Sequence, residues 1–111
     1  MSETARWPTP WVRAALDLAV LGSLAQGPRH GYALAQELQA RGFGRLRGGS
    51  LYPVLARLQE AGHVEATWVE VESGPGRKDY RLTPGGRGHL AEGLAAWADL
   101  GETLRTDEEG R

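Results

Sequence analysis

The sequence contains no cysteine, and Lys78 is its only lysine. The absence of cysteine excludes disulfide bonds and thiolate metal sites, and it allows a cytosolic location without requiring one. Long hydrophobic runs are also missing, because the longest, near residues 14–21, is interrupted by Asp17 and is too short to cross a bilayer. The first ten residues are mostly polar and include two prolines, unlike a signal peptide. We therefore expect no membrane partner.

A large net charge is absent as well. The 111 residues carry a formal charge of −1, which excludes a wholly basic surface. The charge is unevenly distributed, because residues 41–87 hold eight basic and five acidic side chains, whereas residues 88–111 hold two basic and six acidic ones. The positive middle of the chain indicates a polyanionic partner, although scattered solvated charge explains these sums equally well. The length suits one domain with a modest core.

Two helices are predicted before residue 43. The first has Thr9 as its cap and Pro10 at its first position, where the missing N–H costs no helical hydrogen bond, and Gly27-Pro28 ends it. Apolar residues cover most of its circumference, so this helix should be central. The second helix covers about residues 31–41 and stops at Gly42. Its expected apolar positions are Tyr32, Leu34, Ala35 and Leu38.

The stretch "GGSLYPVLARLQEAGHVE" predicts a third helix with two different faces. Ser50 is the expected N-cap and Gly62 the stop. Apolar residues recur with the spacing i, i+3, i+4, i+7 and predict a core face made of Leu51, Val54, Leu55 and Leu58. The face turned away from the core keeps Tyr52, Pro53 and Arg57. Taken alone, this pattern is most typical of an ordinary surface helix.

Residues 64–82 change to a period of two and predict a β-hairpin. The turn residues 73–76, Ser-Gly-Pro-Gly, lie near its tip, which ends in Arg77 and Lys78. We expect Trp68 to lie in the core and to hold the hairpin to the third helix.

A long last helix should begin with Thr83 as cap and Pro84 at its first position, and should run to about Leu104. Its apolar residues are spaced 4, 3, 4, 3, which is a short heptad seam with a glycine in one slot. The seam consists of Leu90, Leu94, Trp97, Gly101 and Leu104. A helix with this pattern has one face that needs a partner.

The order helix, helix, helix, hairpin, long helix predicts a mainly α fold with a β-hairpin wing, that is, a winged helix-turn-helix followed by a long C-terminal dimerisation helix. We expect a winged helix-turn-helix DNA-binding domain at 9–83 and the dimerisation helix at 84–105. The B-DNA major groove admits one α-helix, and basic groups on two elements that this fold brings together favour DNA over a chance pattern. The predicted DNA-binding residues are Ser50, Tyr52, Pro53, Arg57, Arg45, Arg47, Arg77 and Lys78.

Three segments of the chain also resemble the PadR family of bacterial transcriptional regulators. They are "LDLAVLGSLAQGPRHGYALAQEL", "GGSLYPVLARLQEAGHVEATW" and "GPGRKDYRLTPGGRGHL", and the resemblance covers about residues 12 to 104. It implies a homodimer that binds a pseudo-palindromic operator in double-stranded DNA, usually as a repressor released by a small-molecule effector, in the bacterial cytoplasm at the nucleoid. Asp79 interrupts the run of basic residues that the family usually carries at the wing, which implies a weaker phosphate contact there.

The single C-terminal helix resembles the compact subfamily, in whose multidrug-sensing members a tryptophan of this helix stacks on planar ligands. Trp97 in "LAAWADL" falls at the matching position. It is therefore either a platform for a planar hydrophobic effector or a packing residue of the dimer, and Gly93 and Gly101 on either side favour the platform because they leave room around the ring. The residues predicted for the dimer interface are Leu90, Leu94, Trp97, Leu104 and Trp11.

The remaining motifs predict neither an enzyme nor a cofactor. His30, His63 and His89 are far apart in the sequence, so we predict no metal site, and Glu92 should pair with His89 at the surface. The stretch "GPGRK" lacks the spacing of a phosphate-binding P-loop, and no nucleophile motif is present. The rival hypothesis is a winged-helix protein-interaction module that does not bind DNA. A DNA mobility shift would separate the two.

Overall fold

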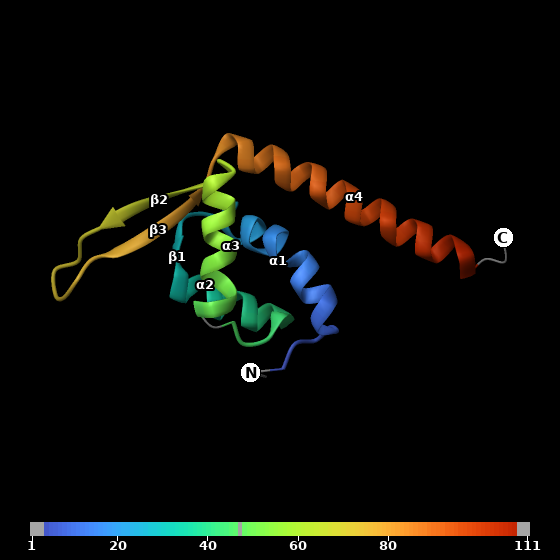
Figure 1. Ribbon diagram of the computed structural model, residues 1–111, viewed down its shortest axis with the longest axis horizontal. Coiled ribbons are helices and arrows are strands. Elements are labelled where there is room, and N and C mark those ends of the chain that lie inside the picture. Colours follow the sequence, from blue (N-terminus) through green and yellow to red (C-terminus); the bar gives the residue numbers. More distant parts are fainter. Residues whose placement is uncertain (1–3, 47, 109–111) are drawn as a thin grey trace.

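The computed structural model describes residues 4–46 and 48–108, in which a small antiparallel sheet projects as a wing from one side of a helical body (Figure 1). In chain order the elements are α1 (Thr9–Leu24), β1 (Arg29–His30), α2 (Gly31–Leu38), the π-type turn η1 (Gln39–Phe43), α3 (Gly48–Glu60), β2 (Val64–Val69), β3 (Arg77–Leu82) and α4 (Pro84–Glu108). The wing and α4 leave the body in opposite directions, and the molecule is 61 Å long (Figure 1). This is the predicted winged helix-turn-helix with a long C-terminal helix.

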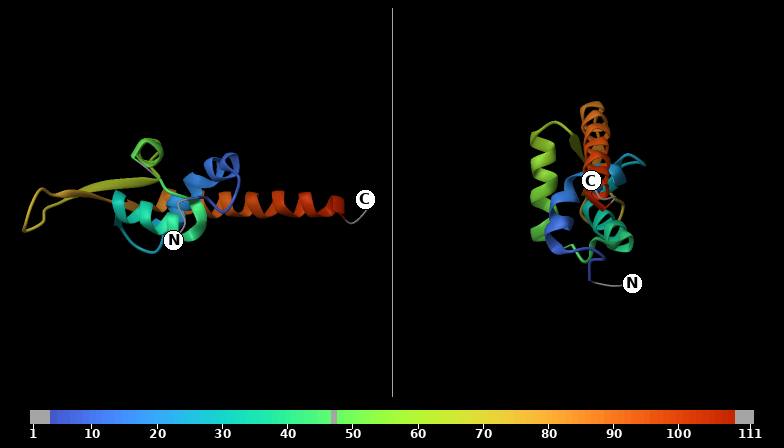
Figure 2. Two further views of the ribbon diagram at one scale, coloured as in Figure 1. Left: turned by 90° about the horizontal axis from the view of Figure 1, so that it is seen from below. Right: turned by 90° about the vertical axis from the view of Figure 1, so that its right-hand side faces the viewer.

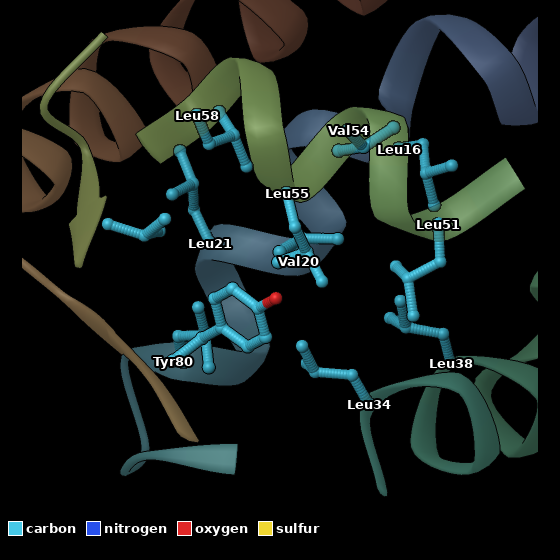
Figure 3. Packing of buried hydrophobic residues seen from close by; sticks show 12 residues of the cluster. Leu16, Val20, Leu21, Leu34, Leu38, Leu51, Val54, Leu55, Leu58 and Tyr80 are labelled. Atoms are coloured by element: carbon cyan, nitrogen blue, oxygen red, sulfur yellow. The ribbon is translucent and has the colours of Figure 1, made fainter. Parts of the chain in front are cut away.

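The core lies between α1, α2, α3 and the base of the sheet (Figure 3). Val20 and Leu21 of α1 have no exposed surface, as expected of a central helix. The predicted core face of α3 is buried throughout, with exposed fractions of 1–6% for Leu51, Val54, Leu55 and Leu58. Since each buried aliphatic side chain contributes about 1.5–3 kcal/mol, this stripe fixes how α3 is turned on the body.

Two predicted helix starts are wrong. Pro8, with extended backbone, occupies the N-cap position of α1, so Thr9 is the first helical residue and caps nothing. Helix α3 begins at Gly48 rather than after Ser50, which places Pro53 inside the helix. A serine cap is worth only about 1 kcal/mol, so it does not by itself fix where a helix begins.

Helix α2 ends at Leu38, three residues before the expected end at 41, and η1 continues it as a wider turn. Gly42 ends the winding with φ +104°, a left-handed backbone that suits glycine. The predicted stop at Gly42 is therefore correct, although the helix itself is shorter than expected.

The predicted stop of α3 at Gly62 is confirmed. Gly62 has φ +82° and donates its N–H to the carbonyl of Gln59 at 3.0 Å. The next residue, His63, donates its N–H to the carbonyl of Leu58 at 2.9 Å. This pair of hydrogen bonds is the Schellman arrangement, which turns the chain sharply from α3 into β2.

The predicted cap of α4 is also confirmed. The Thr83 hydroxyl oxygen accepts the N–H of Gly86 at 2.9 Å, one turn into the helix. The same hydroxyl donates to the carbonyl of Gly62 at 2.6 Å. Thr83 therefore both starts α4 and ties it to the end of α3.

The sheet contains a strand that was not predicted. Its order is β1-β3-β2, and Arg29 and His30 of β1 pair with Tyr80 and Asp79 of β3. A two-residue strand carries no periodicity that a sequence pattern can reveal. It joins the start of α2 to the wing.

The prediction that Trp68 lies in the core is wrong, because its side chain is 60% exposed. Val64 and Ala66 share its face of β2 and are buried and half-buried, but Trp68 is two residues farther along the strand and exposed. Strand β2 runs outward from the helices (Figures 1 and 2). The Trp68 indole lies against Gly76 across the hairpin instead. The sequence correctly predicted that buried and exposed side chains alternate along β2. It did not predict that the core ends before Trp68.

Helix α4 extends to Glu108, beyond the expected end near Leu104, and its second half projects free of the body (Figures 1 and 2). Its first half packs on α1, where the Leu18 side chain fills the space beside Gly93. Among the described residues, no helix combines the length and apolar character that crossing a membrane requires.

Candidate nucleic-acid interface

Helix α3 lies on one side of the molecule, with the wing on one flank and the N-terminal half of α1 on the other (Figures 1 and 2). Because its apolar stripe faces the body, Ser50, Tyr52, Pro53 and Arg57 are all exposed. Pro53 and Ala56 stand near the middle of the exposed arc, where small side chains allow a close approach to a partner. Tyr52 lies toward the wing, and Ser50 and Arg57 lie toward α1.

On the wing flank, residues of β1, α2, α3 and β3 surround a cavity of about 400 Å³. Tyr52 of α3 meets Arg77 and Lys78 of β3 there, as the sequence predicted for a winged helix. The start of α2 forms the third wall, where the Tyr52 ring lies so close to Gly31 that a side chain at this glycine would collide with it. Two predicted elements are thus brought together around one concave, positively charged surface.

Sequence reasoning missed two residues of this surface, His30 and Tyr32. Their rings stack with centroids 6.5 Å apart, and Tyr32 is 67% exposed rather than one of the core positions of the second helix. The Tyr32 hydroxyl accepts a hydrogen bond from the Gln36 side chain at 3.1 Å. The stretch "HGY" is the sequence feature that could have indicated this exposure. Tyr32 is in the first turn of an eight-residue helix and follows a glycine, and an aromatic side chain at such a position need not face the core.

Tyr80 closes the cavity from inside. Its ring belongs to the core, between Val20 and Leu34 (Figure 3), and only 6% of the residue is exposed. Burial raises the pKa of the Tyr80 hydroxyl above its usual value, and the neighbouring Tyr52 raises that pKa further. The phenol is uncharged at neutral pH and lines this surface as a neutral hydrogen-bonding group.

Acidic partners compensate several of the basic residues. Arg57 lies 2.7 Å from Asp17 of α1, and Arg77 lies 3.1 Å from Asp79 of its own strand. The side chain of Lys78 makes no hydrogen bond or ion pair with any residue that the structure describes. The predicted positive charge at the wing therefore resides mainly on Lys78, as the interruption by Asp79 suggested.

The two arginines expected before α3 differ in what the structure says of them. Arg45 is exposed and lines a cavity together with Ser50, on the flank opposite the wing. Arg47 lies outside the described residues.

The predicted dimer seam forms a second surface, on α4 and the start of α1. Leu90 is half-buried against the core, whereas farther along the helix the apolar side chains stay in solvent. The exposed fractions are 54% for Leu94, 40% for Trp97, 49% for Leu100, 64% for Leu104 and 62% for Trp11. Contiguous exposed apolar surface of this kind marks an interaction site in a protein of this size.

Trp97 stands between two adjoining apolar cavities. The first, of about 270 Å³, lies between α1 and α4 and is lined by Leu18, Leu90 and Leu94. The second, of about 320 Å³, is lined by Trp7, Trp11 and Phe43. The room expected beside Gly93 is absent, because Leu18 occupies it, whereas nothing lies within 4 Å of a side chain built at Gly101. Trp97 is therefore accessible from its Trp11 side rather than across Gly93.

The histidines take part in a different contact from the one expected. His89 stacks on His63 with ring centroids 4.2 Å apart, rather than pairing with Glu92. The Schellman turn after Gly62 carries His63 to the first turns of α4, and this long-range placement decides the contact. Among the described residues, no group of three histidine and carboxylate side chains could hold a metal ion.

Comparison with known proteins agrees with this arrangement. Residues 20–92 match the model of the transcriptional regulator PadR-like family. The transcriptional regulator Rv3488 of Mycobacterium tuberculosis is 41% identical over 88 residues, which cover 79% of this chain and 80% of that protein.

Solved structures of two family members share the fold. A PadR family transcriptional regulator from Eggerthella lenta superposes with a TM-score of 0.83 at 31% identity, covering 92% of this chain and 88% of the other. A PadR-like transcriptional regulator from Bacillus cereus superposes with a TM-score of 0.79 at 29% identity, covering 92% of this chain and 99% of the other. Members of this family regulate transcription and are not enzymes. The chain, with its wing, its exposed α3 and its projecting α4, belongs to the PadR-like family of transcriptional regulators.

Proposed function

We propose that the protein binds a pseudo-palindromic operator in double-stranded DNA as a homodimer and acts as a repressor. Helix α3 enters the major groove, and the wing follows the adjacent backbone. The observation that carries this proposal is the cavity where Tyr52 of α3 meets Arg77 and Lys78 of the wing. A helix face and a cationic hairpin on one concave surface suit a groove and its phosphates.

The roles of individual residues follow from their places around α3. Pro53 and Ala56 allow close approach to the base edges, while Ser50, Tyr52 and Arg57 reach bases or sugars from the two sides of the helix. Lys78 contacts phosphate and carries no sequence information. His30 and Tyr32 extend the same surface to the start of α2.

The homodimer forms through the seam on α4. Leu94, Trp97 and Leu104 point into solvent in the single chain, and a second copy of the same helix buries them by two-fold symmetry. Leu90 lies at the inner end of this seam, and Trp11 of α1 extends it. Two copies of α3 then meet successive major grooves about one helical turn, roughly 34–36 Å, apart.

An effector site lies within the same interface. The two apolar cavities beside Trp97 offer an aromatic face and aliphatic walls, which suit a planar hydrophobic molecule. A ligand there changes the packing of α4 on α1, and therefore the separation of the two α3 helices. A ligand-released repressor of this kind acts in the bacterial cytoplasm, at the nucleoid.

Selection from a randomised 30-base-pair duplex library, followed by fluorescence anisotropy with the enriched sequence, tests the proposal. We expect enrichment of an inverted repeat and an affinity that falls steeply as salt increases, because phosphate contacts release counterions. A flat salt response without enrichment would contradict DNA binding and favour the protein-interaction module.

Two substitutions separate the predicted roles. Lys78→Ala should lower the affinity for selected and scrambled duplexes by the same factor. Arg57→Ala should instead reduce the ratio between the affinities for the selected and the scrambled duplex. Arg105→Ala, which removes the same charge near the far end of α4, is the control for net charge. Equal effects of the Lys78 and Arg57 variants on both duplexes would overturn the assignment.

A further inference from the structure

We propose that the flank of α3 opposite the wing holds a second site for a DNA backbone phosphate, to which Arg13 of α1 contributes the principal charge. This inference rests on the proposed operator binding and extends it to a residue outside the predicted interface. It makes the protein hold both walls of the major groove, one with the wing and the other with α1.

The site is a cavity of about 520 Å³ between α1, the turn after η1 and α3. Its apolar base is formed by residues of the core face, including Val12 and Leu16. Its polar rim consists of Thr9, Arg13, Arg45, Ser50 and Arg57. Three guanidinium groups and two hydroxyl groups thus surround one opening.

The charge of this rim calls for an anion. Among the described residues that line the cavity there is no carboxylate, and Arg57 is paired with Asp17, which is outside that lining. The side chain of Arg13 is exposed and makes no hydrogen bond or ion pair with any residue in the described part of the chain. Like charges around one cavity repel each other, and an anion bound between them relieves that repulsion.

Helix geometry holds Arg13 in place. Thr9, Arg13 and Asp17 are successive i, i+4 neighbours on α1 and share one face of that helix. Asp17 bonds Arg57, so this face of α1 is turned toward α3, and Arg13 lies one turn from the ion pair. Its guanidinium is therefore carried by a rigid element beside the exposed arc of α3.

The dimensions of DNA explain why this flank meets a phosphate. A helix in the major groove, which is about 12 Å wide, lies between two sugar-phosphate strands. The wing stands on one flank of α3 and the N-terminal half of α1 on the other (Figure 1), so each flank faces a different strand. A phosphodiester presents two oxygens that a planar guanidinium contacts in pairs. Arg13 therefore adds affinity without sequence preference.

Arg13→Gln tests the site by the salt dependence of operator binding. The slope of log affinity against log salt should become shallower by about 1.8 for a dimer, since each lost phosphate contact removes about 0.9. The affinities of Arg13→Gln for selected and scrambled duplexes should fall by the same factor. Arg13→Lys, which keeps the charge, should restore most of the slope, and Arg105→Gln should leave it unchanged.

The outcomes distinguish this site from the proposed function as a whole. If Arg13→Gln binds with the wild-type slope while Lys78→Ala has a shallower one, the second phosphate site is wrong and operator binding stands. If the wild type shows no salt-dependent DNA binding, both fail.

A free anion is the other source of phosphate. If 10 mM inorganic phosphate at constant ionic strength raises the melting temperature of the wild type but not of Arg13→Gln, and the slopes are equal, the pocket takes a free anion and the proposal is overturned.

Discussion

The guanidinium of Arg57 lies 2.7 Å from the carboxylate of Asp17, so an ion pair joins the exposed face of α3 to the central helix α1. The side chains of Arg57 and Asp17 are 59% and 31% exposed, and a solvated pair of this kind contributes about 0–1 kcal/mol to stability. Its effect on binding is larger, because Asp17 compensates a positive charge on the surface that faces the proposed DNA.

Asp17→Asn should therefore strengthen DNA binding while changing the free energy of unfolding by less than about 1 kcal/mol. The neutral amide frees Arg57 for the DNA and removes a negative charge beside the groove, so we expect tighter binding in anisotropy titrations and a steeper salt slope. Asp99→Asn on α4 makes the same change of charge and is the matched control. Weaker binding of Asp17→Asn than of Asp99→Asn would contradict this competition, and would mean that Asp17 holds Arg57 in the orientation that contacts the DNA.

Leu104→Asp should separate the dimer without unfolding the chain. Leu104 is 64% exposed and lines none of the described cavities, so the single chain loses little packing. In the dimer the new carboxylate is buried on both sides of the seam, where each unpaired charge costs several kcal/mol. We expect the dimer dissociation constant, measured by analytical ultracentrifugation, to rise by more than about 100-fold.

Ala95→Asp is the control for Leu104→Asp, because Ala95 lies on the opposite face of α4. Far-UV circular dichroism of both variants should match the wild type. If Leu104→Asp has the same dimer dissociation constant as the wild type, the dimer interface does not include Leu104.

The features that could be predicted from the sequence are those set by local chemistry. The core face of α3 follows from four apolar residues at helical spacing, and the ends at Gly62 and Thr83 follow from backbone conformation and a side-chain cap. Each signal lies within a few residues of the structure that it predicts. The order of elements, and with it the winged helix, followed from these local signals.

The features that could not be predicted depend on contacts between distant segments. The Arg57–Asp17 pair joins residues 40 apart in the chain, and β1 exists only because β3 lies beside it. Trp68 alternates as a core residue should, yet the core ends before it is reached. Arg13 lies within residues 1–40, which hold three basic and three acidic side chains, so the charge pattern does not single it out. Only the folded structure shows that Arg13 lines the same cavity as Arg57.

Trp97→Ala should weaken the binding of acridine, a planar tricyclic dye. Stacking on the indole contributes about 0.5–1.5 kcal/mol beyond area burial, so we expect the dissociation constant to rise by at least about 2- to 10-fold. Quenching of tryptophan fluorescence in the wild type measures binding, and dye fluorescence measures it in the variant. Trp68→Ala, on the wing, is the control and should leave the affinity unchanged. If Trp97→Ala binds acridine with unchanged affinity, Trp97 is not a ligand platform and its role is to pack in the dimer.

Two glycines of the first turns of α4 should respond in opposite directions to alanine. A side chain at Gly86 would overlap the carbonyl oxygen of His63 and lie 2.7 Å from a methyl group of Leu82, whereas nothing lies within 4 Å of a side chain at Gly88. Gly86→Ala should therefore destabilise the protein by about 1–3 kcal/mol through overpacking. Gly88→Ala should stabilise it by up to about 1 kcal/mol, because alanine favours the helix.

Urea denaturation of both variants and the wild type measures these differences. All three proteins are compared at one concentration, because the proposed dimer makes stability depend on concentration. The close approach at Gly86 holds the start of α4 against the turn at His63, and so sets the direction in which α4 leaves the body. Gly86→Ala should for this reason weaken the dimer as well as the fold, whereas Gly88→Ala should leave the dimer unchanged. If the two variants are equally stable, the contact between Gly86 and His63 is looser than the structure places it, and the direction of α4 is set by Leu18 and Gly93 instead.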